Sequence, residues 1–246
     1  MVALQMDRAL ALCPEIDVGD PELLRNPTPS PRLVISAPEP ESVLFARNVK
    51  AFSQITIEGT DSAVYVGEST RLLGTKIFIT GDRARVIIGP RARLKTGEIH
   101  VQADDGLVVI GAKTTWESGR ILCDRGKAVI IGNDCMFSNR VMIRTSDGHG
   151  IWDNKTGALL NAAADVFIDH HVWLGNSARV NKGTRIGMGA VLAQCAVASG
   201  DLAPECVHAG IPARVIKEDI HWTRRVAIDE IPDQYRLPRG EWDQAE

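Results

Sequence analysis

Between Ile168 and Val197 the hydrophobic pattern repeats every six residues. An aliphatic residue opens each hexad, at Ile168, Leu174, Val180, Ile186 and Leu192. A small or β-branched residue follows four positions later, at Val172, Ala178, Thr184, Ala190 and Ala196. A helix needs a period near 3.6 and a half-buried strand a period of 2, and neither fits. The repeat predicts a parallel β-helix, in which three hexads, about 18 residues, close one triangular coil.

A looser form of the repeat precedes this stretch. Four apolar runs end at Gly67, Gly89, Gly111 and Gly132, with spacings of 22, 22 and 21 residues. Turn sequences rich in Asp and Gly recur between these runs, so we expect larger coils that lead directly into the strict frame. The predicted fold class is therefore all-β, with one continuous solenoid over residues 45–215.

The spacing fails once, after Gly148. The frame resumes only at Ile168, so residues 149–165 are an insertion at one corner of a coil. Insertions in a solenoid map to surface loops, and long loops often carry function. We therefore expect a functional loop that begins at His149.

The two ends of the chain differ from the repeats. Residues 1–44 hold seven of the twelve prolines and are predicted to form an extended N-terminal arm. Residues 216–246 are predicted to be a charged tail, with a short helix over residues 218–227.

Composition narrows the functional classes. A formal net charge of −3 argues against a general nucleic-acid-binding protein. The sequence has neither an apolar run of membrane-spanning length nor a basic-then-apolar leader, so we expect a cytoplasmic protein. The five cysteines include no CxxC pair, which fits reduced thiols better than disulfides or a zinc site.

Three stretches resemble the hexapeptide-repeat acyltransferases: residues 165–175, 180–187 and 209–217. Within that superfamily the chain is most similar to the galactoside and maltose acetyltransferases and to bacterial polysaccharide O-acetyltransferases. The resemblance implies a left-handed β-helix, a homotrimer, and acetyl-CoA bound as co-substrate between neighbouring subunits. It further implies O-acetylation of a sugar or polysaccharide hydroxyl, without a metal.

The same resemblance implies catalytic roles for three residues. His149, in the motif Ser146-Asp-Gly-His149, stands where the relatives have their catalytic histidine. A neutral imidazole can take the proton of an attacking hydroxyl, so we predict that His149 is the general base. Asn139 lies one position out of register with an asparagine that assists the relatives' base or oxyanion. Asp147 is a candidate to orient the imidazole, although an Asp before Gly also forms turns.

A second set of residues is implied at the donor site. Trp173 matches a tryptophan that lines this site in the relatives, and packing at a subunit interface is its alternative role. Arg214 and Lys217 match a basic pair that meets the CoA phosphate. The backbone or side chains of three more residues are expected to flank CoA, namely Ala193, Gln194 and Ser199.

The insertion also supplies candidate acceptor contacts. These are Trp152, Asp153 and Asn154. The adjacent His170 and His171 are predicted to be surface residues beside the loop.

Three other functions remain open on this fold. N-acylation of a nucleotide sugar would differ from O-acetylation of a sugar hydroxyl in the acceptor alone. A zinc enzyme of the γ-carbonic anhydrase type would need three converging ligands, and the six histidines include no His-x4-His pair. A non-catalytic scaffold would have no reason to combine a histidine-bearing loop, an outward tryptophan and a basic ending.

Overall fold

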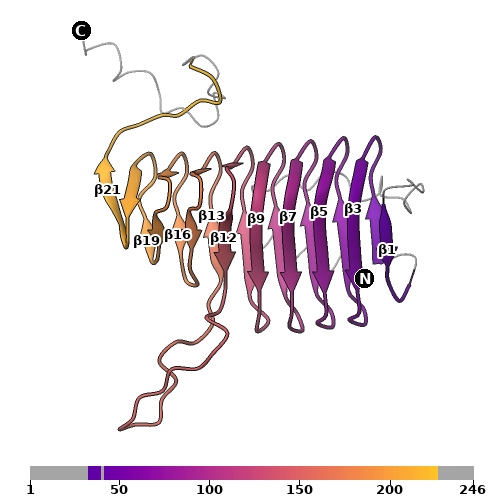
Figure 1. The fold of residues 1–246 in the computed structure, drawn as a ribbon, viewed down its shortest axis with the longest axis horizontal. Helices are drawn as coiled ribbons and strands as arrows, with labels where there is room; N and C mark the ends of the chain where they lie inside the picture. The colour runs from indigo at the N-terminus through magenta and orange to yellow at the C-terminus, as the bar shows by residue number, and fades with distance from the viewer. Residues whose placement is uncertain (1–32, 40–41, 227–246) are drawn as a thin grey trace.

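Parallel strands stacked coil upon coil make up the protein in its computed structural model, which describes residues 33–39 and 42–226 (Figure 1). Among the described strands, the one antiparallel pair is β20 with β21, at the C-terminal end of the stack. The described residues contain no α-helix. None of them therefore forms a helix long and apolar enough to cross a lipid bilayer.

One side of the solenoid, face A, is a sheet of short strands in the order β19-β16-β13-β10-β8-β6-β4-β2. Its strands are β2 (Val43–Phe45), β4 (Ala63–Val66), β6 (Arg85–Ile88), β8 (Leu107–Ile110), β10 (Ala128–Ile131), β13 (Val166–Ile168), β16 (Arg185–Ile186) and β19 (Asp201–Leu202).

A second sheet covers the rest of the solenoid. Its first strands are β1 (Val34–Ser36) and the long β3 (Lys50–Ile57), β5 (Arg71–Ile79), β7 (Arg93–Val101) and β9 (Thr115–Cys123). Beyond β9 each coil has two short strands in place of one long one. Face B1 then contains β11 (Met136–Phe137), β14 (Trp173–Leu174), β17 (Val191–Leu192), β20 (Val207–Gly210) and β21 (Ala213–Lys217). Face B2 contains the second halves of β5, β7 and β9, and after them β12 (Val141–Arg144), β15 (Arg179–Val180) and β18 (Val197–Ala198).

The interior is lined by the residues that the repeat marks. The five aliphatic residues that open the hexads are at most 2% exposed, and the small residues four positions later are at most 1% exposed. Burying one such aliphatic side chain contributes roughly 1.5–3 kcal/mol. In the larger coils Trp116 is also inside, and its indole N–H donates a hydrogen bond to the Ser118 carbonyl (2.9 Å). The predicted all-β solenoid is confirmed.

The strand ladder begins before residue 45. Val34 of β1 pairs with Gln54 of β3, and Val43 of β2 pairs with Val64 of β4. Part of the segment that we assigned to an N-terminal arm therefore lies in the first strands of the solenoid. These strands have three residues each, and the prolines around them obscured their apolar pattern. The rest of the predicted arm, residues 1–32 and 40–41, lies outside the described residues.

The helix expected over residues 218–227 is wrong for residues 218–226, and residue 227 lies outside the described residues. Residues 218–226, the C-terminal strap, instead run extended from β21 back along the solenoid (Figure 1). Asp219 has a φ of 54°, which a right-handed helix does not allow. The Ile220 N–H donates to the Glu205 carbonyl (2.9 Å), so this backbone group bonds to the last coil and not to a helical turn of the strap.

Candidate active site

The three-sided coils place the candidate residues at different corners. After β10 the chain turns from face A to B1 at residues 132–135, from B1 to B2 at 138–140, and from B2 to A through the insertion. Asn139 lies at the second corner, His149 at the third, and Trp173 starts β14 just after the first corner of the next coil. The four residues of β12 alone span about 13 Å. One chain therefore does not bring Asn139, His149 and Trp173 together.

His149 lies exposed in the insertion, which leaves the solenoid after β12 and extends well away from it (Figure 1). Asn161 fixes the backbone here, because its Nδ2 donates to the His149 carbonyl (2.8 Å) and its Oδ1 accepts from the Ile151 N–H (2.7 Å). Among the described residues, no side chain is hydrogen-bonded to the imidazole. The ring is thus open to a substrate, on a backbone that is held in place.

Asp147 anchors the base of the insertion. Its carboxylate pairs with Lys182 of the next coil, accepts a hydrogen bond from Asn161 Nδ2 (3.0 Å), and lies 3.6 Å from Arg144 Nη2. Lys182 above all, and then Asn161, lower the pKa of Asp147. The carboxylate is therefore occupied by groups that position the loop, and within the described structure it makes no bond to the imidazole.

The tip of the insertion is a closed turn. Asp153 Oδ1 accepts from the backbone N–H groups of Lys155 (2.9 Å) and Thr156 (2.7 Å) and from the Thr156 hydroxyl (2.9 Å). These bonds, chiefly those from Thr156, lower the pKa of Asp153. Trp152 is 60% exposed and Asn154 is exposed as well. Trp152 and Asn154 can meet a partner or substrate, whereas Asp153 shapes the turn.

Two of the donor-site candidates share one row on face B1. The register pairs Trp173 with Val191, Val191 with Val207, and Val207 with Lys217. Three strand spacings, about 14 Å, separate Trp173 from Lys217. Arg214 is exposed on the same β21 strand.

The other donor-site candidates occupy corners. Ala193 and Gln194 form the turn from β17 to β18, and Ser199 lies in the turn that follows β18. The C-terminal coils therefore carry all six candidates, distributed over two corners and one face.

The surface positions predicted for His170 and His171 are wrong, because these residues are only 8% and 4% exposed. His170 Nδ1 accepts a hydrogen bond from the Asn133 N–H (2.8 Å) of the preceding coil. The His171 ring is covered by Trp222 of the strap, with ring centroids 4.1 Å apart and planes inclined by 7°. The hexad placed both histidines outward, but it carried no information about the strap that covers them.

Four residues form a clasp that holds the strap: Asp134, His171, Trp222 and Arg224. His171 Nδ1 lies 2.8 Å from Asp134 Oδ2, and its Nε2 lies 3.0 Å from the Trp222 carbonyl. Both ring nitrogens of His171 thus face oxygen atoms of the clasp. The Trp222 indole N–H donates to the His171 carbonyl (2.8 Å), and Arg224 Nη2 lies 3.1 Å from Asp134 Oδ1.

The charge of Asp134 stabilises the clasp. Burial opposes its ionisation, but hydrogen bonds and charges from His171 and Arg224 outweigh burial, so the pKa of Asp134 is below its usual value. A lowered carboxyl pKa contributes stability above the unfolded pKa, and that contribution is lost as the pH falls through the folded one. Trp222 also lies 6.0 Å from Trp173, centroid to centroid. The clasp thus covers one side of a candidate donor-site residue.

We expect Trp222→Ala to release the strap. The change removes an aromatic stack and an indole hydrogen bond, together about 2 kcal/mol of local stability. Limited proteolysis should then cut after residue 217 at least tenfold faster, with the β signal of the circular dichroism spectrum retained. Trp152→Ala, at an exposed tryptophan of the insertion, is the matched control. Unchanged protection of the strap in Trp222→Ala would contradict the clasp.

The described residues give little support to metal chemistry or thiol chemistry. The described part of the chain contains no group of three or more His, Cys, Asp or Glu side chains that could hold a metal ion. Burial raises the pKa of the Cys135 thiol to about 12, so this thiol stays protonated and unreactive near neutral pH.

The β-helical geometry agrees with the comparisons to known proteins. No family model matches it. A polysialic acid O-acetyltransferase of Neisseria meningitidis is 32% identical over 175 residues, which cover 71% of this chain and 81% of that protein. The chain belongs to the hexapeptide-repeat acetyltransferases. The family resemblance given by the repeat motifs is thereby confirmed.

Two further comparisons extend this assignment. A polysialic acid O-acetyltransferase of Escherichia coli O1:K1 / APEC is 34% identical over 108 residues, so this acetyltransferase chain spans 35% of that relative's length. The crystal structure of the polysialic acid O-acetyltransferase OatWY matches with a TM-score of 0.71 and 27% identity, covering 83% of this chain and 96% of that one. The left-handed β-helix implied by the resemblance is confirmed.

Sequence reasoning missed residues that shape this candidate site. Lys182 lies at the same corner as Asp147, one coil later, so the repeat register could have paired them. Asn161 gave no such signal, because it lies inside the insertion, where the hexad is interrupted. Trp222 gave none either, since it meets His171 across 51 residues of sequence.

Proposed function

We propose that this chain transfers the acetyl group of acetyl-CoA to a hydroxyl of an anionic polysaccharide of the polysialic acid type, with His149 as general base. The observation that carries the proposal is the similarity to a polysialic acid O-acetyltransferase over 81% of that relative's length. We place the reaction in the cytoplasm, in keeping with the thiols of Cys135, Cys195 and Cys206, which are not in disulfides.

The proposed reaction is a direct transfer. The imidazole of His149 takes the proton of the acceptor hydroxyl while the hydroxyl oxygen forms a bond to the thioester carbonyl carbon. Backbone N–H groups stabilise the oxyanion that develops. The C–S bond then breaks, and the leaving thiolate receives the proton back from His149. Asn161 and Asp147 serve as positioning residues, because they hold the loop and not the ring.

We further propose that the site is completed in a homotrimer. Two observations support this assembly. Asn139, His149 and Trp173 lie at different corners of one chain, so only a second subunit can place a donor residue beside His149. The insertion also exposes large apolar side chains that a neighbouring subunit would cover, at Ile151 (58%), Trp152 (60%) and Leu160 (61%).

In the proposed trimer the donor and acceptor groups divide between subunits. Trp173, Arg214 and Lys217 of one subunit contact CoA, together with the turns at residues 193–194 and 199. The insertion of the next subunit brings His149, with Trp152 and Asn154 toward the acceptor.

The proposal is tested by incubating the protein with acetyl-CoA and polysialic acid and measuring released CoA thiol. We expect CoA release that depends on the polysaccharide, and transferred acetyl groups, traced by a label from acetyl-CoA, that mild alkali removes as it removes esters. Alkali-stable label in the product would assign N-acylation instead. Absence of transfer to polysialic acid would overturn the proposed acceptor.

A further inference from the structure

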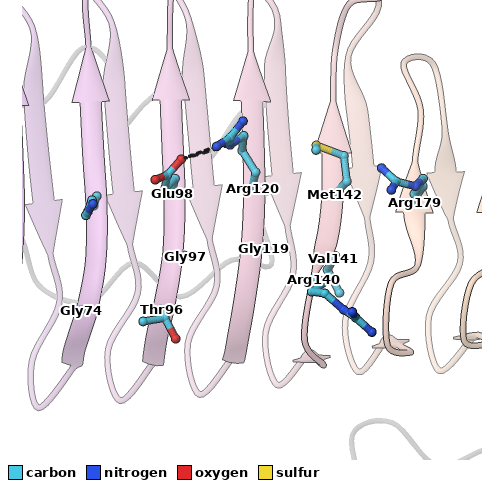
Figure 2. A pocket seen from close by; sticks show the side chains of 11 residues that line it. Gly74, Thr96, Gly97, Glu98, Gly119, Arg120, Arg140, Val141, Met142 and Arg179 are labelled. Atoms are coloured by element: carbon cyan, nitrogen blue, oxygen red, sulfur yellow. Dashed lines mark hydrogen bonds and ion pairs between the residues drawn. The ribbon is translucent and has the colours of Figure 1, made fainter.

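One row of side chains crosses face B2 from coil to coil. Lys76 of β5 is in register with Glu98, Glu98 with Arg120, Arg120 with Met142, and Met142 with Arg179 of β15. This set, the charged row, presents one residue per coil at intervals of about 4.8 Å. Figure 2 labels four residues of this row, Glu98, Arg120, Met142 and Arg179, on neighbouring strands.

A groove follows the charged row. Its volume is about 470 Å³, and glycines on three successive strands, Gly74, Gly97 and Gly119, line it together with the row (Figure 2). Only at Gly74 is there room for a side chain, because an added Cβ would meet just the Thr96 Cγ2 atom, at 3.4 Å. Apart from Arg140, which directly precedes β12, the lining residues belong to β5, β7, β9, β12 and β15, so the groove crosses several coils.

The groove has an excess of positive charge. Its lining contains four cations, Lys76, Arg120, Arg140 and Arg179, and one carboxylate, Glu98. Arg120 Nη2 lies 2.7 Å from Glu98 Oε2, so this pair neutralises itself. Lys76 and Arg179 are exposed at the two ends of the row and offer charge to a ligand.

A second row runs beside the first, two residues further along each strand. Phe78 and His100 are in register and stack with ring centroids 4.9 Å apart, and Leu122 and Arg144 continue the row. The stacked pair adds an apolar surface beside the charged row, which can contact the apolar part of a ligand. The row ends at Arg144, 3.6 Å from Asp147, which anchors the loop of His149.

We propose that face B2 binds an extended anionic polysaccharide along the solenoid axis, with its negative groups on the charged row and its sugar rings over Phe78 and His100. This inference rests on the proposed function and adds where the acceptor chain lies before it reaches His149. The excess of cations selects an anionic chain over a neutral one.

Binding of fluorescently labelled polysialic acid tests this inference without acetyl-CoA. The double variant Lys76→Glu with Arg179→Glu should bind the polysaccharide roughly tenfold or more weakly than the native protein. The native protein should lose affinity as salt is added, because screening weakens charge contacts. Neutral dextran should bind far more weakly than polysialic acid.

The matched control is Lys50→Glu with Arg71→Glu, which reverses two exposed cations that lie in register outside the groove. It should bind polysialic acid within twofold of the native protein. Equal losses in both double variants, or no binding by the native protein, would overturn the inference. A groove variant that changes the oligomeric mass in light scattering would also overturn it, by assigning face B2 to subunit packing. Binding without acetyl transfer would leave the groove standing and refute the proposed function.

Discussion

His149→Ala should lower kcat for acetyl transfer by about 10² to 10⁴-fold, the usual contribution of a positioned general base. The imidazole is exposed and makes no side-chain hydrogen bond within the described residues, so its loss leaves the solenoid and the loop anchors intact. The KM for acetyl-CoA should change little, because the proposed contacts to the donor come from other residues. Steady-state kinetics with CoA detection measures both parameters.

The control for this variant lies on the same loop. Lys155 is exposed near the tip of the insertion, and Lys155→Ala should retain nearly native kcat. Loss of activity in both variants would indicate a disturbed loop instead of a missing base. Native kcat in His149→Ala would remove the base from the mechanism altogether.

The fold followed from the sequence wherever the six-residue period was strict. Ile168, Leu174 and Val180 are interior because the same positions of every hexad must point inward in a triangular coil. The period carried no information about segments that lie on the solenoid from outside. Trp222 covers His171 across 51 residues, and that contact depends on where the strap returns in space.

The sequence predicted individual residues of the candidate site but not how they are arranged relative to one another. Resemblance identified Asn139, His149 and Trp173, and the coil register places each at its own corner. What the hexad could not supply is the loop geometry, because residues 149–165 leave the repeat. There Asp147 turned out to bond Asn161 and Lys182 instead of the imidazole. The functional pairings therefore depend on the insertion and, in the proposed trimer, on a second subunit.

Gly119→Ala should destabilise the solenoid by about 4 kcal/mol or more, since two steric penalties coincide. Gly119 has a φ of +144°, which L residues rarely adopt, and an added Cβ would lie 1.9 Å from the Val141 carbonyl oxygen. That oxygen belongs to the backbone of β12, which pairs with β9 at this point, so it cannot move away without breaking the ladder. The melting temperature should fall by about 8–16 °C.

Gly74→Ala separates the effect of backbone strain from the effect of a steric clash. Gly74 also has a positive φ, +105°, but its added Cβ would meet only the Thr96 Cγ2 atom, at 3.4 Å. This variant should therefore lose about 1–2 kcal/mol from backbone strain alone and melt only a few degrees lower. Thermal melting followed by circular dichroism distinguishes the two variants. Equal melting temperatures would show that strand β12 can move away at Val141. A large difference would show that the close approach of the β12 backbone at Val141, and not the positive φ alone, makes glycine necessary at position 119.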